Sequence, residues 1–166
     1  MPVSDKNPNT DEHSADAFAL ENFLPYRLSL LSNTISGGIS NAYRKVYDLS
    51  VTEWRVLAIL GRYPGLTATE VTERGAMDKV AVSRAVNRLE LRSLVERGEH
   101  GSDRRRVPLV LSEGPGKALF NDVMPRALAY EKALLASLTD EERATLERLV
   151  GTLQAAAEQL GELGSE

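Results

Sequence analysis

Apolar residues recur at steps of three and four over much of the chain, which is the spacing typical of amphipathic helices. The first such stretch runs from about Asn22 to Tyr47, and Pro25 falls in its first turn, where proline is tolerated. Its apolar positions are Leu24, Leu28, Leu31, Ile35, Ile39, Tyr43 and Val46. Gly37 and Gly38 each disfavour a helix by roughly 1 kcal/mol relative to alanine. We therefore expect the helix to kink there, or another group to approach it closely.

Three further helices begin with the same signal, a Ser or Thr followed three residues later by Glu. The two side chains of such a capping box satisfy backbone N–H groups at the start of a helix reciprocally. The boxes are Ser50–Glu53, Thr67–Glu70 and Thr139–Glu142. The first predicts a helix that ends before Pro64-Gly65, and the second predicts a short helix that ends at Gly75.

Residues 79–93, KVAVSRAVNRLELRS, form another predicted helix, for which Asp78 is the N-cap. Its apolar face consists of Val82, Val86 and Leu89. Polar and basic side chains occupy the other side, namely Ser83, Arg84, Asn87 and Arg88. The pattern thus predicts one face for packing and one face for a polar partner or solvent.

The periodicity then changes from that of helices to that of strands. Leu94 to Glu99 predicts a short strand, Gly98 to Arg105 a turn, and residues 107–111 alternate as in a half-buried strand. Pro108 cannot donate to a strand ladder, so we expect its strand to be an edge. Two long helices follow this predicted hairpin. The first bends near Pro125, and the second repeats leucine like the seam between packed helices.

Charge is distributed unevenly along the chain. The formal net charge is −4, but residues 79–106 contain eight basic and four acidic residues, so the remainder carries −8. A basic segment on an acidic body is typical of a surface that binds a nucleic-acid groove.

Composition narrows the class of protein further. Charged residues are 27% and hydrophobic residues 42% of the chain, as in ordinary soluble globular proteins, and the apolar stretches are too short to span a bilayer. The polar, acidic N-terminal segment does not resemble a secretory signal, so we expect a cytoplasmic protein with no membrane partner. There is no cysteine, and the two histidines are His13 and His100. We therefore expect no catalytic triad, no metal site and no cofactor, and predict that the chain is not an enzyme.

The segment AMDKVAVSRAVNRLELRSLVERGEHGSDRRRVPLVLSEGPGKALF resembles the MarR (multiple antibiotic resistance regulator) family. Members of that family carry a recognition helix, a wing with an Asp-x-Arg motif, here Asp103-Arg104-Arg105, and a strand that ends in Leu-Ser/Thr-x-x-Gly. The resemblance implies a mainly α fold in which dimerisation helices flank a winged helix-turn-helix lobe with a β-hairpin wing. We expect a flexible tail over residues 1–15, an N-terminal dimerisation helix over 16–49, the DNA-binding lobe over 50–111 and C-terminal dimerisation helices over 112–166.

The resemblance also implies that the chain binds double-stranded DNA at a palindromic operator as a homodimer. In the recognition helix, Ser83, Arg84 and Asn87 are candidates to read bases in the major groove, because arginine can pair with guanine there. Lys79 and Arg88 lie at positions better suited to phosphate. In the wing, the resemblance assigns Arg105 to the minor groove and Asp103 to holding its side chain, whereas Arg104 and Arg106 are candidate phosphate contacts or solvated charges.

The segments FLPYRLSLLS and EWRVLAILG resemble family members that regulate aromatic-acid catabolism. This resemblance implies a repressor of a nearby operon that is released by a small aromatic acid or its coenzyme A thioester. The polar-tipped candidates for the ligand site are Tyr26, Arg27, Ser32 and Trp54. Trp54 is also a candidate core residue and Arg27 a candidate for a structural ion pair.

Two alternatives to this interpretation stay open. One is a repressor of efflux or stress genes with a broad hydrophobic ligand pocket. The other is a protein–protein interaction module, which the basic face of the predicted recognition helix argues against.

Overall fold

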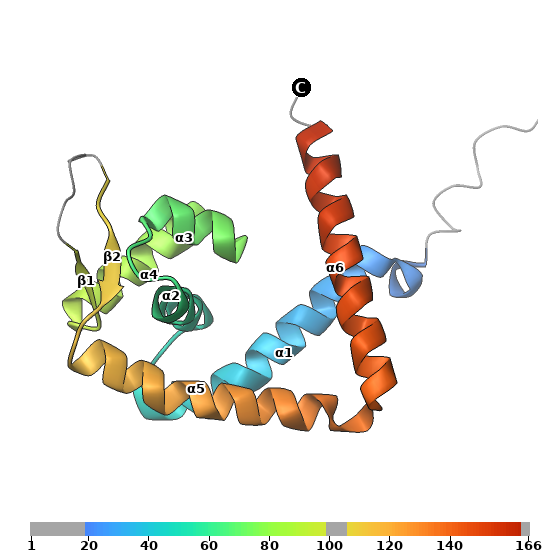
Figure 1. Cartoon of the computed structure of the whole chain (residues 1–166), viewed down its shortest axis with the longest axis horizontal. Helices are drawn as coiled ribbons and strands as arrows, with labels where there is room; N and C mark the ends of the chain where they lie inside the picture. Colours follow the sequence, from blue (N-terminus) through green and yellow to red (C-terminus); the bar gives the residue numbers. More distant parts are fainter. Residues whose placement is uncertain (1–18, 99–105, 164–166) are drawn as a thin grey trace, which may run out of the picture. The chain divides into compact units, whose positions relative to one another are not determined.

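The part of the chain that the structure describes is mainly helical. A computed structural model describes residues 19–98 and 106–163. Its elements are η1 (Leu20–Asn22), α1 (Leu24–Tyr47), α2 (Val51–Arg62), α3 (Ala68–Gly75), α4 (Lys79–Leu91), β1 (Val95–Arg97), β2 (Leu109–Leu111), α5 (Pro115–Leu134), η2 (Leu135–Ser137) and α6 (Asp140–Leu163) (Figure 1). This order confirms the predicted fold class, a winged helix-turn-helix lobe flanked by long helices. Contacts within the chain divide it into two units, Met1–Gly38 and Ile39–Glu166, which are described separately.

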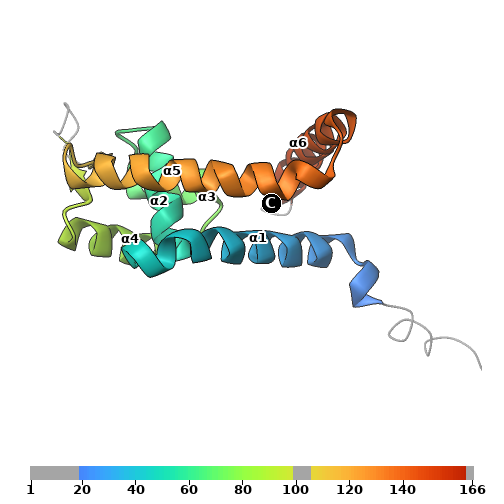
Figure 2. The same cartoon turned by 90° about the horizontal axis from the view of Figure 1, so that it is seen from below.

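The first long helix, α1, is continuous through Gly37 and Gly38 (Figure 2). A Cβ atom built on Gly37 would meet nothing within 4 Å. The chain is therefore helical through both glycines, and a side chain at Gly37 would have open space around it.

All three predicted capping boxes are formed. Ser50 N donates to Glu53 Oε2 at 2.7 Å, Thr67 N to Glu70 Oε2 at 2.7 Å and Thr139 N to Glu142 Oε2 at 2.8 Å, and the returning bonds to the Ser and Thr hydroxyls are present in each case. Asp78 Oδ1 likewise accepts from Ala81 N at 2.8 Å, which confirms it as the N-cap of α4.

The core lies in the second unit, where α2, α3 and α4 pack together beside the hairpin (Figure 1). The predicted apolar face of α4 is buried, with Val82, Val86 and Leu89 at most 3% exposed. Trp54 of α2 is also in this core and lies beside Tyr43, with ring centroids 5.6 Å apart. Burial raises the pKa of Tyr43 to about 12.

The hairpin pairs β1 with β2 in antiparallel register, with Val95 opposite Leu111 and Arg97 opposite Leu109. Leu109 also forms a bridge with Leu66 on its other side, where its N–H donates to Leu66 O at 2.8 Å. The second strand is therefore not a free edge at Leu109. Pro108 lies just before the strand and uses its carbonyl, which accepts from Gly98 N at 2.8 Å.

The start of α5 is fixed by one tightly packed glycine. Ser112 Oγ donates to Ser93 O at 2.7 Å and accepts from Gly116 N at 2.8 Å. A Cβ atom on Gly116 would lie 2.1 Å from Leu94 O, so only glycine fits there. Gly116 follows Ser112 by four residues, one more than the Leu-Ser/Thr-x-x-Gly spacing. Pro125 lies inside α5, which continues past it to Leu134.

Two contacts in the second unit secure the C-terminal end of α1. Arg92, directly after α4, donates to Asp48 O at 3.0 Å and to Tyr47 O at 2.6 Å. The Tyr47 hydroxyl donates to a carboxylate oxygen of Asp122 in α5, and this hydrogen bond raises the pKa of Tyr47. The end of α1 is thus bonded both to the end of α4 and to α5.

Within residues 19–98 and 106–163, no helix is both long and apolar enough to cross a membrane.

Candidate nucleic-acid interface

The outer face of α4 presents the side chains that the sequence marked as DNA contacts. Ser83, Arg84, Asn87 and Arg88 are exposed, and Lys79 is exposed at the first turn. Because the apolar face of the same helix is buried against α2 and α3, this polar face must point away from the core. The helix therefore brings a hydroxyl, an amide and several cations together on one open surface.

Arg84 differs from Arg88 in having no partner within the described part of the chain. Among the described residues, none forms a hydrogen bond or an ion pair with its guanidinium. Its N–H donors are therefore available to a partner outside the chain, and a guanidinium can make paired bonds to a planar acceptor such as a guanine edge.

Arg88, one turn further along, is held differently. Its Nε lies 3.1 Å from Oε1 of Glu53, and the side chains are 57% and 1% exposed respectively. The contact is an ion pair and not an aligned hydrogen bond, because Oε1 has no hydrogen-bond partner among the described residues. Glu53 is thus a buried carboxylate beneath the exposed polar face of α4.

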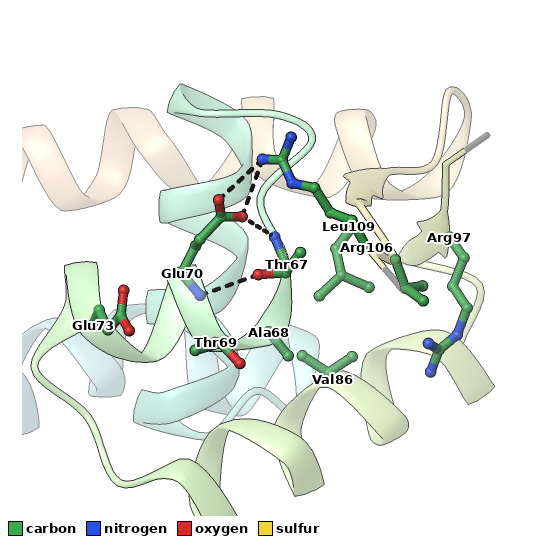
Figure 3. Close-up of a pocket in the computed structure, with 10 residues that line it drawn as sticks. Thr67, Ala68, Thr69, Glu70, Glu73, Val86, Arg97, Arg106 and Leu109 are labelled. Atoms are coloured by element: carbon green, nitrogen blue, oxygen red, sulfur yellow. Dashed lines mark hydrogen bonds and ion pairs between the residues drawn. The ribbon is translucent and has the colours of Figure 1, made fainter. Parts of the chain in front are cut away.

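The Asp-x-Arg motif of the wing lies entirely within residues 99–105, outside the described residues. Asp103, Arg104 and Arg105 all fall in that gap, and the described part of the wing resumes at Arg106. The Arg106 Nη2 atom donates to both carboxylate oxygens of Glu70, at 3.0 and 3.2 Å (Figure 3). Hydrogen bonds from Thr67, first from its backbone and then from its side chain, and the Arg106 guanidinium hold the pKa of Glu70 below its ordinary value.

Glu70 and Arg106 border a hollow of about 530 Å³ between α3, α4 and the base of the hairpin (Figure 3). Val86 and Leu109 contribute apolar surface to it, and Arg97 lies at its hairpin side. Arg97 is itself paired with Glu90 of α4 at 2.8 Å. Two ion pairs therefore join the hairpin to the helix-turn-helix, one to α3 and one to α4.

Sequence reasoning missed the roles of Glu53, Arg92 and Glu70 in holding this surface together. Glu53 was recognised only as part of a capping box, although its place among the apolar residues of α2 signalled burial. Nothing in the local pattern indicated that Arg92 would bond to the end of α1, because that contact joins residues 44 or more positions apart.

Two of the four candidate ligand residues line a common pocket and two do not. Tyr26 and Arg27 border a pocket of about 440 Å³ within the first unit, together with Glu21, Leu30, Leu31 and Thr34. Ser32 is exposed and does not line this pocket, and Trp54, 9% exposed, belongs to the core of the second unit. The structure thus brings two of the four candidates together.

No group of three or more His, Cys, Asp or Glu side chains in the described parts of the chain is arranged to hold a metal ion.

Comparison with known proteins agrees with this architecture. Residues 47–106, which span α2, α3, α4 and β1, match the family model described as the MarR family. The HTH-type transcriptional repressor MdtR of Bacillus subtilis is 32% identical over 103 residues, which are 62% of this chain and 66%, just under two thirds, of MdtR.

Solved structures extend the likeness beyond the lobe. A MarR/EmrR family transcriptional regulator from Acinetobacter sp. ADP1 matches with a TM-score of 0.78 and 26% identity, covering 86% of this chain and 99% of that protein. The PcaV transcriptional regulator from Streptomyces coelicolor, solved with its natural ligand, matches with a TM-score of 0.69 and 23% identity, covering 85% of this chain and 98% of PcaV.

The fold and the exposed basic face of α4 define a winged helix-turn-helix protein. Residues 47–106 match the MarR family model, and a solved MarR/EmrR family transcriptional regulator shares the fold over most of the chain.

Proposed function

We propose that this protein is a homodimeric repressor that binds a palindromic operator near its own gene. The observation that carries the proposal is the exposed face of α4, on which Ser83, Arg84 and Asn87 stand beside Lys79 and Arg88 above a buried apolar face. A helix of this kind fits the major groove of B-DNA.

Each residue of this face has a proposed role. Arg84 reads a guanine, Ser83 and Asn87 reach neighbouring base edges, and Lys79 and Arg88 contact phosphates. In the wing, Arg105 enters the minor groove with Asp103 holding its side chain. Arg104 and Arg106 contact phosphates. Because the Arg106 guanidinium is paired with Glu70, a phosphate must compete with that carboxylate for it.

The homodimer is supported by apolar side chains left exposed within the chain. On α1, Leu24, Leu28 and Leu31 are 44–53% exposed, and on α6 the spaced leucines are at least 43% exposed. The latter are Leu146, Leu149, Leu153 and Leu160. A second copy that covers these faces would provide the two-fold symmetry that a palindromic operator requires.

The experiment that tests DNA binding is a salt series. Fluorescence anisotropy would measure affinity for the duplex upstream of the gene and for a scrambled duplex of equal length between 50 and roughly 200 mM salt. We expect tighter binding to the upstream duplex and a steep linear fall of log affinity with log salt concentration, because phosphate contacts release counterions. Affinity for neither duplex would favour the alternative of a protein–protein interaction module.

We further propose that a small aromatic acid or its coenzyme A thioester releases the protein from DNA. Arg27 can meet a carboxylate, and Tyr26, Leu30 and Leu31 provide an aromatic and apolar wall in the same pocket. Ser32 and Trp54 stay candidates that this pocket does not include. Among proteins of similar fold, the DNA binding of BpsR from Bordetella bronchiseptica is regulated by 6-hydroxynicotinic acid, an aromatic acid.

The bonds at the end of α1 offer a physical route for such control. Arg92 joins the last carbonyls of α1 to the end of α4, so a ligand that shifts α1 would also bias the recognition helix. A coupling of about 1–3 kcal/mol would lower operator affinity roughly 5- to 150-fold, and DNA would weaken ligand binding by the same factor.

Calorimetric titration with and without operator tests this ligand proposal from both sides. The panel contains hydroxybenzoates, hydroxycinnamates and their coenzyme A thioesters. If no compound in the panel changed operator affinity, the proposal of an aromatic ligand would be rejected and the DNA-binding proposal would stand. It would favour the alternative of an efflux or stress repressor, which the apolar side chains of the same pocket also suit.

A further inference from the structure

We propose that Glu53 is a positioning residue for DNA binding, a buried carboxylate that aims the guanidinium of Arg88 at the phosphate backbone. The inference rests on the proposed DNA-binding function and adds to it a residue that does not itself touch DNA. The two partners differ in exposure, since the Glu53 side chain is 1% exposed and the Arg88 side chain is 57% exposed.

Glu53 is fixed from two directions. Its Oε2 accepts from Ser50 N at 2.7 Å in the capping box of α2, and its Oε1 faces Arg88 Nε at 3.1 Å. A carboxylate that is buried and bonded in this way has little freedom to follow a moving partner. It therefore acts as a fixed point against which the long arginine side chain is ordered.

The geometry leaves the outer end of Arg88 available. Glu53 is contacted through Nε, and no described residue bonds to the two terminal Nη atoms. The guanidinium is planar and its five N–H donors keep a fixed fork geometry. When Nε is held on the inner side, the Nη donors therefore project outward, on the face that Arg84 and Asn87 share.

Orientation of this kind lowers the cost of binding, because a free arginine loses side-chain freedom when it grips a phosphate. A simple electrostatic view predicts the opposite sign. An acidic group near DNA repels phosphates, so removal of Glu53 would tighten binding if its charge were all that mattered. The direction of the effect therefore separates the two explanations.

Glu53→Gln is the sharpest variant. Glutamine keeps the capping box, which accepts Glu or Gln at this position, but it removes the charge that holds Arg88. The matched control is Glu142→Gln, the same change at the same position of the capping box of α6, where the described residues provide no arginine partner. Arg88→Lys is the second variant, since lysine keeps the charge and lacks the fork that lets one group meet two partners.

Anisotropy titrations of full-length protein on the upstream duplex would compare these variants over a salt series. We expect Glu53→Gln and Arg88→Lys each to weaken DNA binding about tenfold, the effect of losing one charged hydrogen bond from Arg88 to a phosphate. We expect Glu53→Gln also to reduce the salt slope, by up to about 0.9 for each Arg88 contact. The double variant should bind no more weakly than either single variant, because Glu53 acts through Arg88. Glu142→Gln should bind like wild type.

Three results would overturn the inference. The first is that Glu53→Gln binds DNA as tightly as wild type or more tightly. The second is that the affinity losses of the two single variants add fully in the double variant. The third is that Glu53→Gln loses affinity while its salt slope stays unchanged. If Glu53→Gln fails to unfold cooperatively, Arg88→Lys carries the test, since its side chain is largely exposed, and wild-type affinity would then contradict the proposal. Failure of the wild type to prefer the upstream duplex would instead refute the proposed function itself.

Discussion

Gly116 shows most sharply how one residue without a side chain determines local structure. Its amide donates to Ser112 Oγ, and the space that a Cβ would occupy is taken by Leu94 O. The strand that ends the wing and the helix that follows it are therefore joined at a contact that any larger residue would separate.

We predict that Gly116→Ala lowers the free energy of unfolding by at least about 1–3 kcal/mol, the usual cost of overpacking. Here the close neighbour is backbone and cannot rotate away. Chemical denaturation would measure the change. The matched control is Gly151→Ala in α6, where a Cβ meets nothing within 4 Å and alanine should stabilise by up to about 1 kcal/mol. Equal effects of the two substitutions would contradict the packing explanation.

The arginines of the proposed interface should differ in what their loss does to specificity. We predict that Arg84→Ala costs about 1–3 kcal/mol and relaxes the preference at one operator position. Arg105→Ala should weaken binding most where the site is A·T-rich, because a narrow minor groove attracts arginine. Affinity for a set of single-base operator variants measures both effects. Uniform losses on every sequence would show that both residues contact phosphate only.

At the scale of the elements, the starts of helices were the most predictable features. Each capping box and the Asp78 cap depend on residues within three positions of one another, so a local pattern is sufficient to find them. The buried face of α4 followed from its periodicity for the same reason.

Contacts between elements could not be predicted in this way. The pairing of Glu53 with Arg88, of Glu70 with Arg106 and of Arg92 with the end of α1 joins helices or a hairpin that are distant in sequence.

The contribution of the Glu70–Arg106 ion pair, between α3 and the wing, to stability should depend on pH. The folded pKa of Glu70 lies below the unfolded value, so its stabilising contribution is fully present above about pH 4.5 and is lost as the pH falls through the folded pKa. We predict that Glu70→Gln, which keeps the capping box, lowers the melting temperature at pH 7 and that its difference from wild type narrows as the pH falls below about 4.5 and through the folded pKa.

Melting curves between pH 3 and pH 7 would measure this difference. The control is Glu147→Gln, which alters an exposed residue of α6 that has no hydrogen bond or ion pair with any described residue. A Glu70→Gln difference that persisted undiminished at pH 3 would show that the carboxylate charge is not what stabilises the contact.

At the scale of the whole molecule, two copies of the chain must act together to read a palindromic operator. A lobe with one recognition helix reads a single half-site, and the exposed leucines of α1 and α6 provide apolar surface for a partner copy. Two recognition helices that enter successive major grooves on one side of the duplex would lie about 34–36 Å apart.

A hydroxyl-radical footprint of the full-length protein on the duplex upstream of its gene tests this central claim most directly. We predict two symmetry-related protected patches whose centres are about 10 base pairs apart, with added protection in the flanking minor grooves where the wings lie. Arg84→Ala should fade both patches together, because each copy contributes one α4. A single patch, or uniform protection that the scrambled duplex shows equally, would contradict a dimeric repressor that reads a palindromic operator.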